Sequence, residues 1–221
     1  MNRREFLVGI AALSLGGCGI SRSFDRASDA FDFWWNGMEG VEVSRAQVAQ
    51  IPYATILAKI GRGPQSLLVL GRIDALDLHW ISADRNVFVT REGRLVKTVG
   101  LPANLVHTRL AGPDPLTTGA AVRASEAAGL VRYVDVMPGN YFDAGVAARY
   151  EPVGEERIEI LELQYDCIVV RERNEVPIMD WSHENRFWID TDSGFVWRSL
   201  QHFAPGTPPV EINITKPAAL A

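Results

Sequence analysis

Cysteine is scarce in this chain of 221 residues, which has only Cys18 and Cys167. Cys18 ends a signal-like segment described below, so Cys167 has no partner for a disulfide within the chain. Cys167 lies in an apolar run and is predicted to be a small buried hydrophobic residue. Long apolar runs are also missing. The run at residues 6–15 is shorter than the roughly 20 residues of a transmembrane helix, and no other segment is long enough to cross a membrane.

Basic residues and catalytic motifs are scarce as well. The 22 Lys and Arg are outnumbered by 27 Asp and Glu, which argues against a nucleic-acid partner because such a partner requires a basic patch. The chain has no serine in a nucleophile elbow, and no glycine-rich loop with a Walker lysine or a dinucleotide fingerprint. The histidines stand singly, without the spacing of metal ligands, at His79, His107, His183 and His202. We therefore expect no catalytic residue, no metal and no cofactor.

Two polar segments allow a functional and an ordinary interpretation. Asp180, His183 and Glu184 fall within six residues and could form an acid–base site, but a polar turn before a strand is the simpler interpretation. The segment Asp190–Gly194 resembles the start of a calcium loop, yet it lacks the third carboxylate and the distal glutamate. Asp and Gly have their usual turn roles there, so we predict a turn.

The N-terminus has the features of an exported lipoprotein. Arg3 and Arg4 precede the apolar run, as in a secretory signal, and residues 15–18 (Leu-Gly-Gly-Cys) resemble a lipobox. We predict removal of residues 1–17 and a covalent lipid on Cys18. The segment around Arg3 and Arg4 also resembles a twin-arginine signal, so both export routes stay open. Gly19 follows the cysteine where Asp commonly signals inner-membrane retention, which favours an outer-membrane anchor facing the periplasm.

The mature chain is predicted to be one β-rich domain at residues 24–221, joined to the lipid by a short tether at residues 18–23. Residues 24–36 have aromatic residues at helical spacing and are predicted to form a helix that packs on the sheet. The alternative is that this aromatic face dips into the lipid headgroups. Residues 101–129 contain several prolines and alanines and are predicted to be an ordered loop with one short helix, acting as a cover.

Most other segments read as short strands separated by tight turns. The expected strands cover residues 53–60, 66–73, 76–82, 87–91, 94–99, 130–136, 145–151, 157–171, 176–181, 185–189, 195–203 and 210–214. A phase change inside 157–171 suggests a β-bulge near Leu161. Close spacing forbids crossover helices, so neighbouring strands must pair antiparallel. We predict a mainly all-β fold, a large bent antiparallel meander that forms a half-barrel or a barrel-like sheet.

The tryptophans of the predicted strands are Trp80, Trp181, Trp188 and Trp197. Tryptophan in a sheet is usually part of the core. The alternative is a stacking surface for sugar rings or a lining for an acyl chain, because indole combines flat apolar area with an N–H donor. These four residues are therefore the candidate contacts with a ligand or partner.

Many short segments match a known family in order. They are Ile51–Ala54, Leu67–Gly71, Trp80–Asp84, Arg91–Leu95, Lys97–Pro102, Asn185–Asp190, Gly194, Trp197–Ser199, Gln201 and Lys216–Pro217. Together they resemble the YjbF family of lipoproteins, which includes the GfcB-type proteins of group 4 capsule clusters. The resemblance covers nearly all of the mature chain and is weakest at residues 105–130.

The resemblance implies a role in assembling or exporting an extracellular polysaccharide. It also implies an outer-membrane location and a gene beside that of a large outer-membrane β-barrel protein, which makes that protein and the polysaccharide the expected partners. It supplies no catalytic residues. Our first hypothesis is thus a non-enzymatic accessory lipoprotein of capsule or exopolysaccharide secretion. A half-barrel that carries lipid or lipoprotein is the alternative, and it needs a sizeable apolar cavity. An enzyme acting on polysaccharide, with two convergent carboxylates, is the third.

Overall fold

The computed structural model describes residues 40–123 and 128–219. The predicted signal, Cys18, the tether and the predicted helix at residues 24–36 lie outside these ranges. The described part begins with a short helix, α2 (Arg45–Gln50), whose first turn is closed by a capping box between Ser44 and Gln47. No helix of the described part is long and apolar enough to span a membrane.

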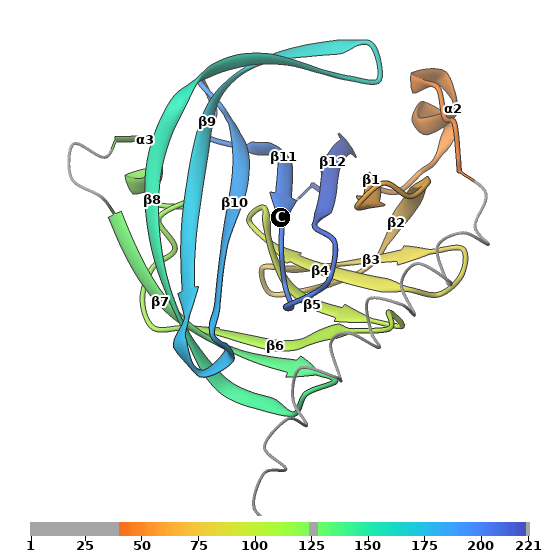
Figure 1. Ribbon diagram of the computed structural model, residues 1–221. Helices are drawn as coiled ribbons and strands as arrows, with labels where there is room; N and C mark the ends of the chain where they lie inside the picture. The colour runs from red at the N-terminus through yellow and green to blue at the C-terminus, as the bar shows by residue number, and fades with distance from the viewer. Residues whose placement is uncertain (1–39, 124–127, 220–221) are drawn as a thin grey trace, which may run out of the picture.

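Twelve antiparallel strands form a single sheet (Figure 1). The first five are β1 (Thr55–Ile60), β2 (Gln65–Asp74), β3 (Asp77–Ser82), β4 (Val87–Arg91) and β5 (Arg94–Val99). The other seven are β6 (Asn104–Leu110), β7 (Ala128–Met137), β8 (Tyr141–Ile160), β9 (Leu163–Val176), β10 (Trp181–Asp190), β11 (Val196–Gln201) and β12 (Val210–Lys216). The predicted all-β, bent antiparallel fold is confirmed.

The order of strands in the sheet is β5-β4-β3-β2-β1-β12-β11-β10-β9-β8-β7-β6. Neighbours are consecutive along the chain except at β1 and β12, which pair antiparallel from Thr55 and Lys216 to Ile60 and Val210. The sheet curls until its two edges, β5 and β6, approach each other, so it is nearly closed into a barrel (Figure 1).

Along the free edge of β5, side chains rather than a backbone ladder bond several backbone groups. The Thr98 hydroxyl accepts a hydrogen bond from the Leu105 amide at 3.0 Å, close to the β5–β6 connection. Farther along β5, the Gln201 side chain accepts from the Leu95 amide and donates to the Gly93 carbonyl, both at 2.9 Å. These bonds satisfy backbone groups that an open sheet edge would leave unpaired.

The interior of the sheet contains two main apolar clusters. The larger spans β1 to β9 and β12 and includes Ile56, Leu68, Trp80, Phe88 and Ile212. The second lies beside β8 to β10 and includes residues of the segment after β6, which ends in α3 (Ala120–Arg123). In that cluster Leu116 and Ala121 pack with Val170 and Phe187. The predicted cover over the sheet is therefore present at residues 111–123, although the segment that precedes it is a strand.

The prediction of a loop for residues 101–129 is wrong at Asn104–Leu110, which form β6. The register of β6 with β7 shifts between Leu105 and His107, so Leu105 and Thr108 are both buried although they are three residues apart. A β-bulge of this kind breaks the strict alternation by which strands are recognised. The sequence pattern therefore does not reveal this strand.

Two further predictions are wrong. The single strand at 157–171 with a bulge near Leu161 is instead a hairpin, because Leu161 and Glu162 form the turn between β8 and β9. Their φ values of 46° and 69° are the pair of positive angles that a two-residue type I′ turn requires. The strand predicted at 176–181 is interrupted by a 3₁₀ helix, η1 (Pro177–Met179), because proline fixes φ and has no N–H for a ladder.

Candidate functional site

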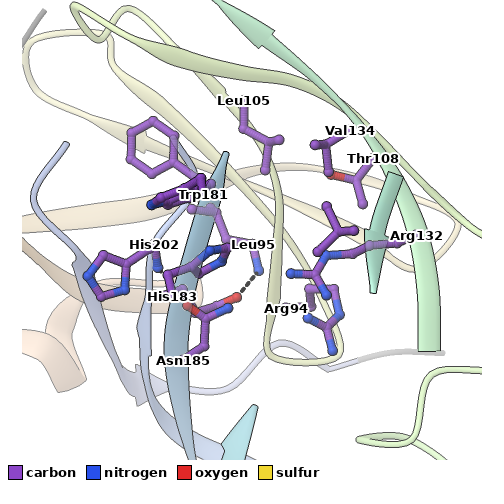
Figure 2. A pocket seen from close by; sticks show the side chains of 13 residues that line it. Arg94, Leu95, Leu105, Thr108, Arg132, Val134, Trp181, His183, Asn185 and His202 are labelled. Carbon is purple, nitrogen blue, oxygen red and sulfur yellow. Dashed lines mark hydrogen bonds between the residues drawn. The ribbon is translucent and has the colours of Figure 1, made fainter. Parts of the chain in front are cut away.

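A small polar cavity lies inside the sheet, where β10 faces β6 and β7 (Figure 2). Its volume of about 20 Å³ is room for about one water molecule. Its polar lining comes from five strands and comprises Arg94, Thr108, Arg132, His183, Asn185 and Gln201. Half-buried Trp181 and His202 complete the polar and aromatic part, and the apolar part includes Leu105, Val134 and Phe203.

Strand alternation brings these polar groups inside. In β7 the inward positions include Leu130, Arg132 and Val134, all buried, so Arg132 occupies a position that its neighbours give to the core. In β10 the buried residues Asn185 and Phe187 share their face with His183. Charged and polar side chains at such positions need hydrogen-bond partners, because bulk water does not solvate them.

His183 is the unusual member of the cavity. Its ring stacks on Trp181, with centroids 3.8 Å apart and planes at 18°, and its centroid is 5.8 Å from that of His202. Neither ring nitrogen has a hydrogen-bond partner among the described protein atoms. Burial, reinforced by the positive charge of Arg132, lowers the pKa of His183 to about 3. His183 is therefore neutral at pH 7, with one donor and one acceptor nitrogen.

Thr108 faces the same cavity from β6. Only 5% of the residue is exposed, and its Oγ1 atom has no hydrogen-bond partner among the described protein atoms. Buried hydroxyls are normally paired, so an unpaired one calls for an explanation. The cavity thus brings together three unpaired polar atoms on two facing strands.

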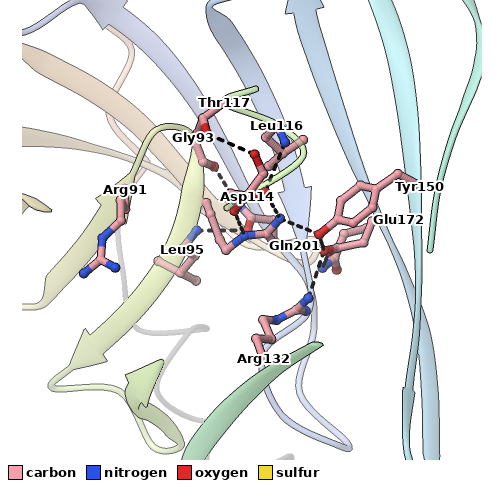
Figure 3. Close-up of polar contacts among 12 residues, drawn as sticks. Arg91, Gly93, Leu95, Asp114, Leu116, Thr117, Arg132, Tyr150, Glu172 and Gln201 are labelled. Carbon is pink, nitrogen blue, oxygen red and sulfur yellow. Dashed lines mark hydrogen bonds and ion pairs between the residues drawn. The ribbon is translucent and has the colours of Figure 1, made fainter. Parts of the chain in front are cut away.

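A buried ionic network lies directly beside the cavity (Figure 3). Its centre is Glu172 of β9, which is fully buried and accepts hydrogen bonds on Oε1 from Arg94 at 2.8 Å, Arg132 at 2.9 Å and Tyr150 at 2.5 Å. The Oε2 atom accepts from Asn185 at 2.6 Å. Oε2 also accepts from Asn174 at 3.2 Å, so both oxygens of this carboxylate have at least two donors.

Arg94 joins the network to the covering segment. Its guanidinium binds both carboxylate oxygens of Asp114, with Nε to Oδ2 at 2.5 Å and Nη2 to Oδ1 at 3.0 Å. Nη2 also donates to the Tyr150 hydroxyl at 2.8 Å. Asp114 in turn accepts the Leu116 amide at 3.1 Å, which fixes the start of the segment that closes this side of the interior.

Two arginines face two carboxylates in the network, and the pKa values of Glu172 and Tyr150 are strongly shifted. Burial alone would raise the pKa of Glu172, but Arg132 and Arg94 hold it well below its usual range. Burial raises the pKa of the Tyr150 hydroxyl far above its ordinary value. General acid–base catalysis favours groups whose pKa lies near the working pH. Glu172 and Tyr150 are therefore poorly suited to transferring protons near pH 7, and their hydrogen bonds join neighbouring strands.

The structure separates the four candidate tryptophans. Trp181 lines the cavity, whereas Trp80 is fully buried in the apolar core and donates to Thr90 Oγ1 at 2.8 Å. Trp188 donates to Glu156 at 2.8 Å on the outer part of the sheet. Trp197 stacks on Tyr165 at 4.0 Å between centroids and donates to Asp190 at 3.0 Å. Only Trp181 lies beside unpaired polar groups, and ligand contact remains a prediction for all four.

The two polar segments singled out from the sequence do not form shared sites within the described residues. His183 faces the interior, while Glu184 is exposed and binds Arg173 at 3.3 Å, because adjacent strand residues point to opposite faces. Asp190 Oδ1 accepts the Ser193 amide at 2.8 Å, and Gly194 has a φ of 73°. The predicted turn at Asp190–Gly194 is confirmed. Cys167 is buried and free, as predicted.

Sequence reasoning missed most of the site, namely Arg94, Thr108, Asp114, Arg132, Tyr150 and Glu172. A signal was present in two strands. In β9 the buried face runs Val170, Glu172, Asn174, Val176, so a charge and an amide interrupt an apolar series. An opposite charge interrupts the buried series of β7 at Arg132. Opposite charges on the apolar faces of two strands indicate a buried ion pair, although they do not indicate which strands meet.

Comparison with known proteins gives the same family over the whole domain. The family model described as "Group 4 capsule polysaccharide lipoprotein gfcB, YjbF" matches residues 28–214. This chain belongs to the YjbF family. It is 30% identical to the Escherichia coli (strain K12) protein named "Uncharacterized lipoprotein GfcB", across 97% of this chain and 99% of that one. It is 26% identical to the lipoprotein YjbF of the same strain, across 82% and 84% of the two chains.

A solved relative has the same fold. The crystal structure of the hypothetical lipoprotein YmcC from Escherichia coli (K12) matches with a TM-score of 0.71 and 30% identity, covering 89% of this chain and 95% of that chain. The family resemblance drawn from the short sequence matches is therefore confirmed. The nearly closed twelve-stranded sheet is the scaffold of a YjbF-family protein.

Proposed function

We propose that this YjbF-family protein is an outer-membrane lipoprotein that acts as a non-enzymatic accessory factor in assembling or exporting a capsule or exopolysaccharide. Lipid on Cys18 anchors it, and the domain faces the periplasm. The observation that carries this proposal is the family match over residues 28–214, because the family is described as a capsule polysaccharide lipoprotein. The protein works by binding a partner, which is an outer-membrane β-barrel protein of the export system or the polysaccharide itself.

The chemistry of the interior supports a binding role. The two carboxylates that are buried among the described residues, Asp114 and Glu172, both bind Arg94, and Glu172 stays ionised because its pKa is held low. A glycosidase needs one carboxylic acid with a raised pKa beside a second carboxylate. Around Arg94, by contrast, the pKa of the Glu172 carboxyl is lowered, not raised. This favours binding over hydrolysis at this site.

The alternative of a lipid carrier has less support. Trp80, Phe88 and Phe187 fill the interior together with smaller apolar side chains. The cavity between β6 and β10 has only about 20 Å³. A second hollow, beside β8 and β9, has about 380 Å³, but its lining includes Arg149, Glu151, Arg173 and Glu175 and is therefore mostly charged. Neither hollow suits an acyl chain, so we favour the accessory role.

The proposal is tested by deleting the gene in the producing strain and measuring cell-associated and released polysaccharide. We expect surface polysaccharide to be lost and the wild-type gene on a plasmid to restore it. Plasmid-borne variants Glu184→Gln and Asp192→Asn, both at exposed polar positions, should restore it equally well. Normal polysaccharide in the deletion strain would refute the role. If one of these variants is folded and abundant but export is lost, the result would indicate an active site and refute the non-enzymatic role.

Anchoring is tested separately. Cys18→Ser removes the thiol to which lipid is attached, so we expect no incorporation of radiolabelled palmitate and loss of the protein from the outer-membrane fraction. Ser23→Ala, in the tether, is the control and should behave as wild type. Equal labelling of the Cys18→Ser protein and wild type would contradict the anchor. Wild-type protein that fractionates with inner-membrane markers would contradict the location.

A further inference from the structure

The three unpaired polar atoms of the cavity suggest a ligand. Thr108 Oγ1 and both ring nitrogens of His183 are buried, face the same cavity and have no partner among the described protein atoms. Thr108 is 5% exposed, so bulk solvent does not satisfy its hydroxyl. Leaving buried polar groups unpaired is costly, and proteins rarely do so without a bound group that completes the hydrogen bonds.

The charge of the surroundings defines the chemistry of that group. Both nearby cations are neutralised, because Arg94 binds Asp114 and Glu172, and Arg132 binds Glu172. His183 is neutral at pH 7, since burial depresses its pKa. The unpaired atoms therefore comprise a neutral imidazole and a hydroxyl, each of which both donates and accepts. A hydroxyl group has the same pair of abilities, whereas a carboxylate only accepts and an ammonium only donates.

The size and mouth of the cavity define how much of the ligand enters. A volume of about 20 Å³ takes one small group and no ring. The half-buried side chains of Trp181, His183 and His202 line the same pocket, with Trp181 and His183 stacked at 3.8 Å. Flat aromatic edges beside a polar pocket suit a sugar ring, which carries its hydroxyls around an apolar frame.

We propose that this cavity binds one hydroxyl group of a sugar residue in the exported polysaccharide, held by Thr108 Oγ1 and the His183 ring while the sugar ring rests at the Trp181–His202 rim. This inference rests on the proposed function, because it selects the glycan as the partner. It assigns positioning of the ligand to Thr108 and His183. It assigns no bond making or breaking.

The test uses the mature lipoprotein in detergent micelles, labelled with ¹⁵N-histidine. The probe is short oligosaccharide prepared by mild acid cleavage of the polysaccharide from the producing strain. We expect the His183 ring nitrogens to shift saturably with added oligosaccharide. Thr108→Val keeps the side-chain shape and removes only an unpaired hydroxyl, so the variant should fold normally and bind about ten-fold more weakly, as expected for one lost hydrogen bond.

The control is His107→Phe, which changes the exposed neighbour of Thr108 on the opposite face of β6 and should bind as wild type. Equal affinity of wild type and Thr108→Val would overturn the inference. So would a crystal structure, grown with the oligosaccharide, in which one water alone bridges Thr108 and His183.

Failure here and failure of the proposed function are distinguishable. If deletion abolishes surface polysaccharide but Thr108→Val restores it fully and no oligosaccharide binds, only the sugar site is wrong. If oligosaccharide binds at His183 but deletion leaves the polysaccharide normal, the sugar site stands and the proposed role in secretion is wrong.

Discussion

The interior of this sheet is built in two different ways on its two sides. Around β1 to β4 and β12, buried side chains such as Ile56, Leu68 and Phe88 are apolar and make contact without directional bonds. Between β5 and β7 to β9, next to the second apolar cluster, Arg94, Arg132 and Glu172 form a buried network of directed hydrogen bonds. The apolar side requires only hydrophobic side chains that fill the space. The loss of stability on substitution there should grow with the volume removed. On the ionic side, removing one partner leaves a buried charge uncompensated, so a single substitution there should cost much stability.

The largest expected effect comes from the ionic side. Glu172→Gln removes the negative charge that faces Arg94 and Arg132, and we expect the free energy of unfolding to fall by about 3–5 kcal/mol, measured by urea unfolding at pH 7. Glu184→Gln, an exposed glutamate on the next strand, is the matched control and should cost at most about 1 kcal/mol. Equal, small losses for both variants would mean that the buried network does not stabilise the fold.

On the apolar side, Leu68→Ala should cost about 2–5 kcal/mol, because Leu68 is fully buried and the cavity left behind is only partly refilled. The distinguishing expectation is that this loss is the same at pH 7 and pH 5, since no titratable group is involved. The measurement is the difference in unfolding free energy between variant and wild type at each pH. A loss that changed with pH would show that the two sides of the interior are coupled.

His183 gives a smaller effect that depends on pH. Its pKa is lowered to about 3 in the folded protein, so between about pH 6.5 and pH 3 the unfolded chain binds a proton that the folded protein does not. Stability should therefore fall as the pH is lowered from 7 to 4, and His183→Phe should reduce that fall. The check is the melting temperature across this range, with His107→Phe as control. Glu172, whose pKa is also depressed, loses its contribution at lower pH, below the ordinary carboxyl range.

The smallest effect is expected outside the interior altogether. Arg157 and Asp166 form a bidentate pair across the β8–β9 hairpin at 2.6 and 3.0 Å, with more than half of each side chain exposed. Arg157→Ala should leave the melting temperature unchanged, because exposed ion pairs are screened by water. A clear loss of stability would show that this hairpin is more than a surface extension.

Sequence patterns predicted the regular strands better than the segments interrupted by a bulge or an unusual turn. The strands at 87–91 and 94–99 were expected with the bounds that β4 and β5 have, because apolar and β-branched residues lie between clear turns there. β6 was missed because its bulge disrupts the alternation, and the β8–β9 turn was missed because Leu161 and Glu162 are not typical turn residues.

The ionic site could be predicted only in part. Arg132 and Glu172 are visible as charges on apolar strand faces, but their pairing depends on a 40-residue separation that local patterns do not encode. The local sequence does not indicate that Thr108 is buried, since threonine occurs on both the buried and the exposed faces of strands. The unpaired atoms of His183 become evident only when the opposite wall of the cavity is known.

The pairing of β1 with β12 has a consequence for how the domain is made. Thr55 bonds with Thr215 through their hydroxyls at 2.7 Å, a contact between residues 160 positions apart. A chain synthesised from its N-terminus therefore holds β1 with one edge unpaired until β12 has been made. Contacts of such long range slow folding, and an exposed strand edge invites wrong partners meanwhile. We therefore expect the emerging chain to be kept unfolded, or shielded by a chaperone, until β12 is available to pair with β1.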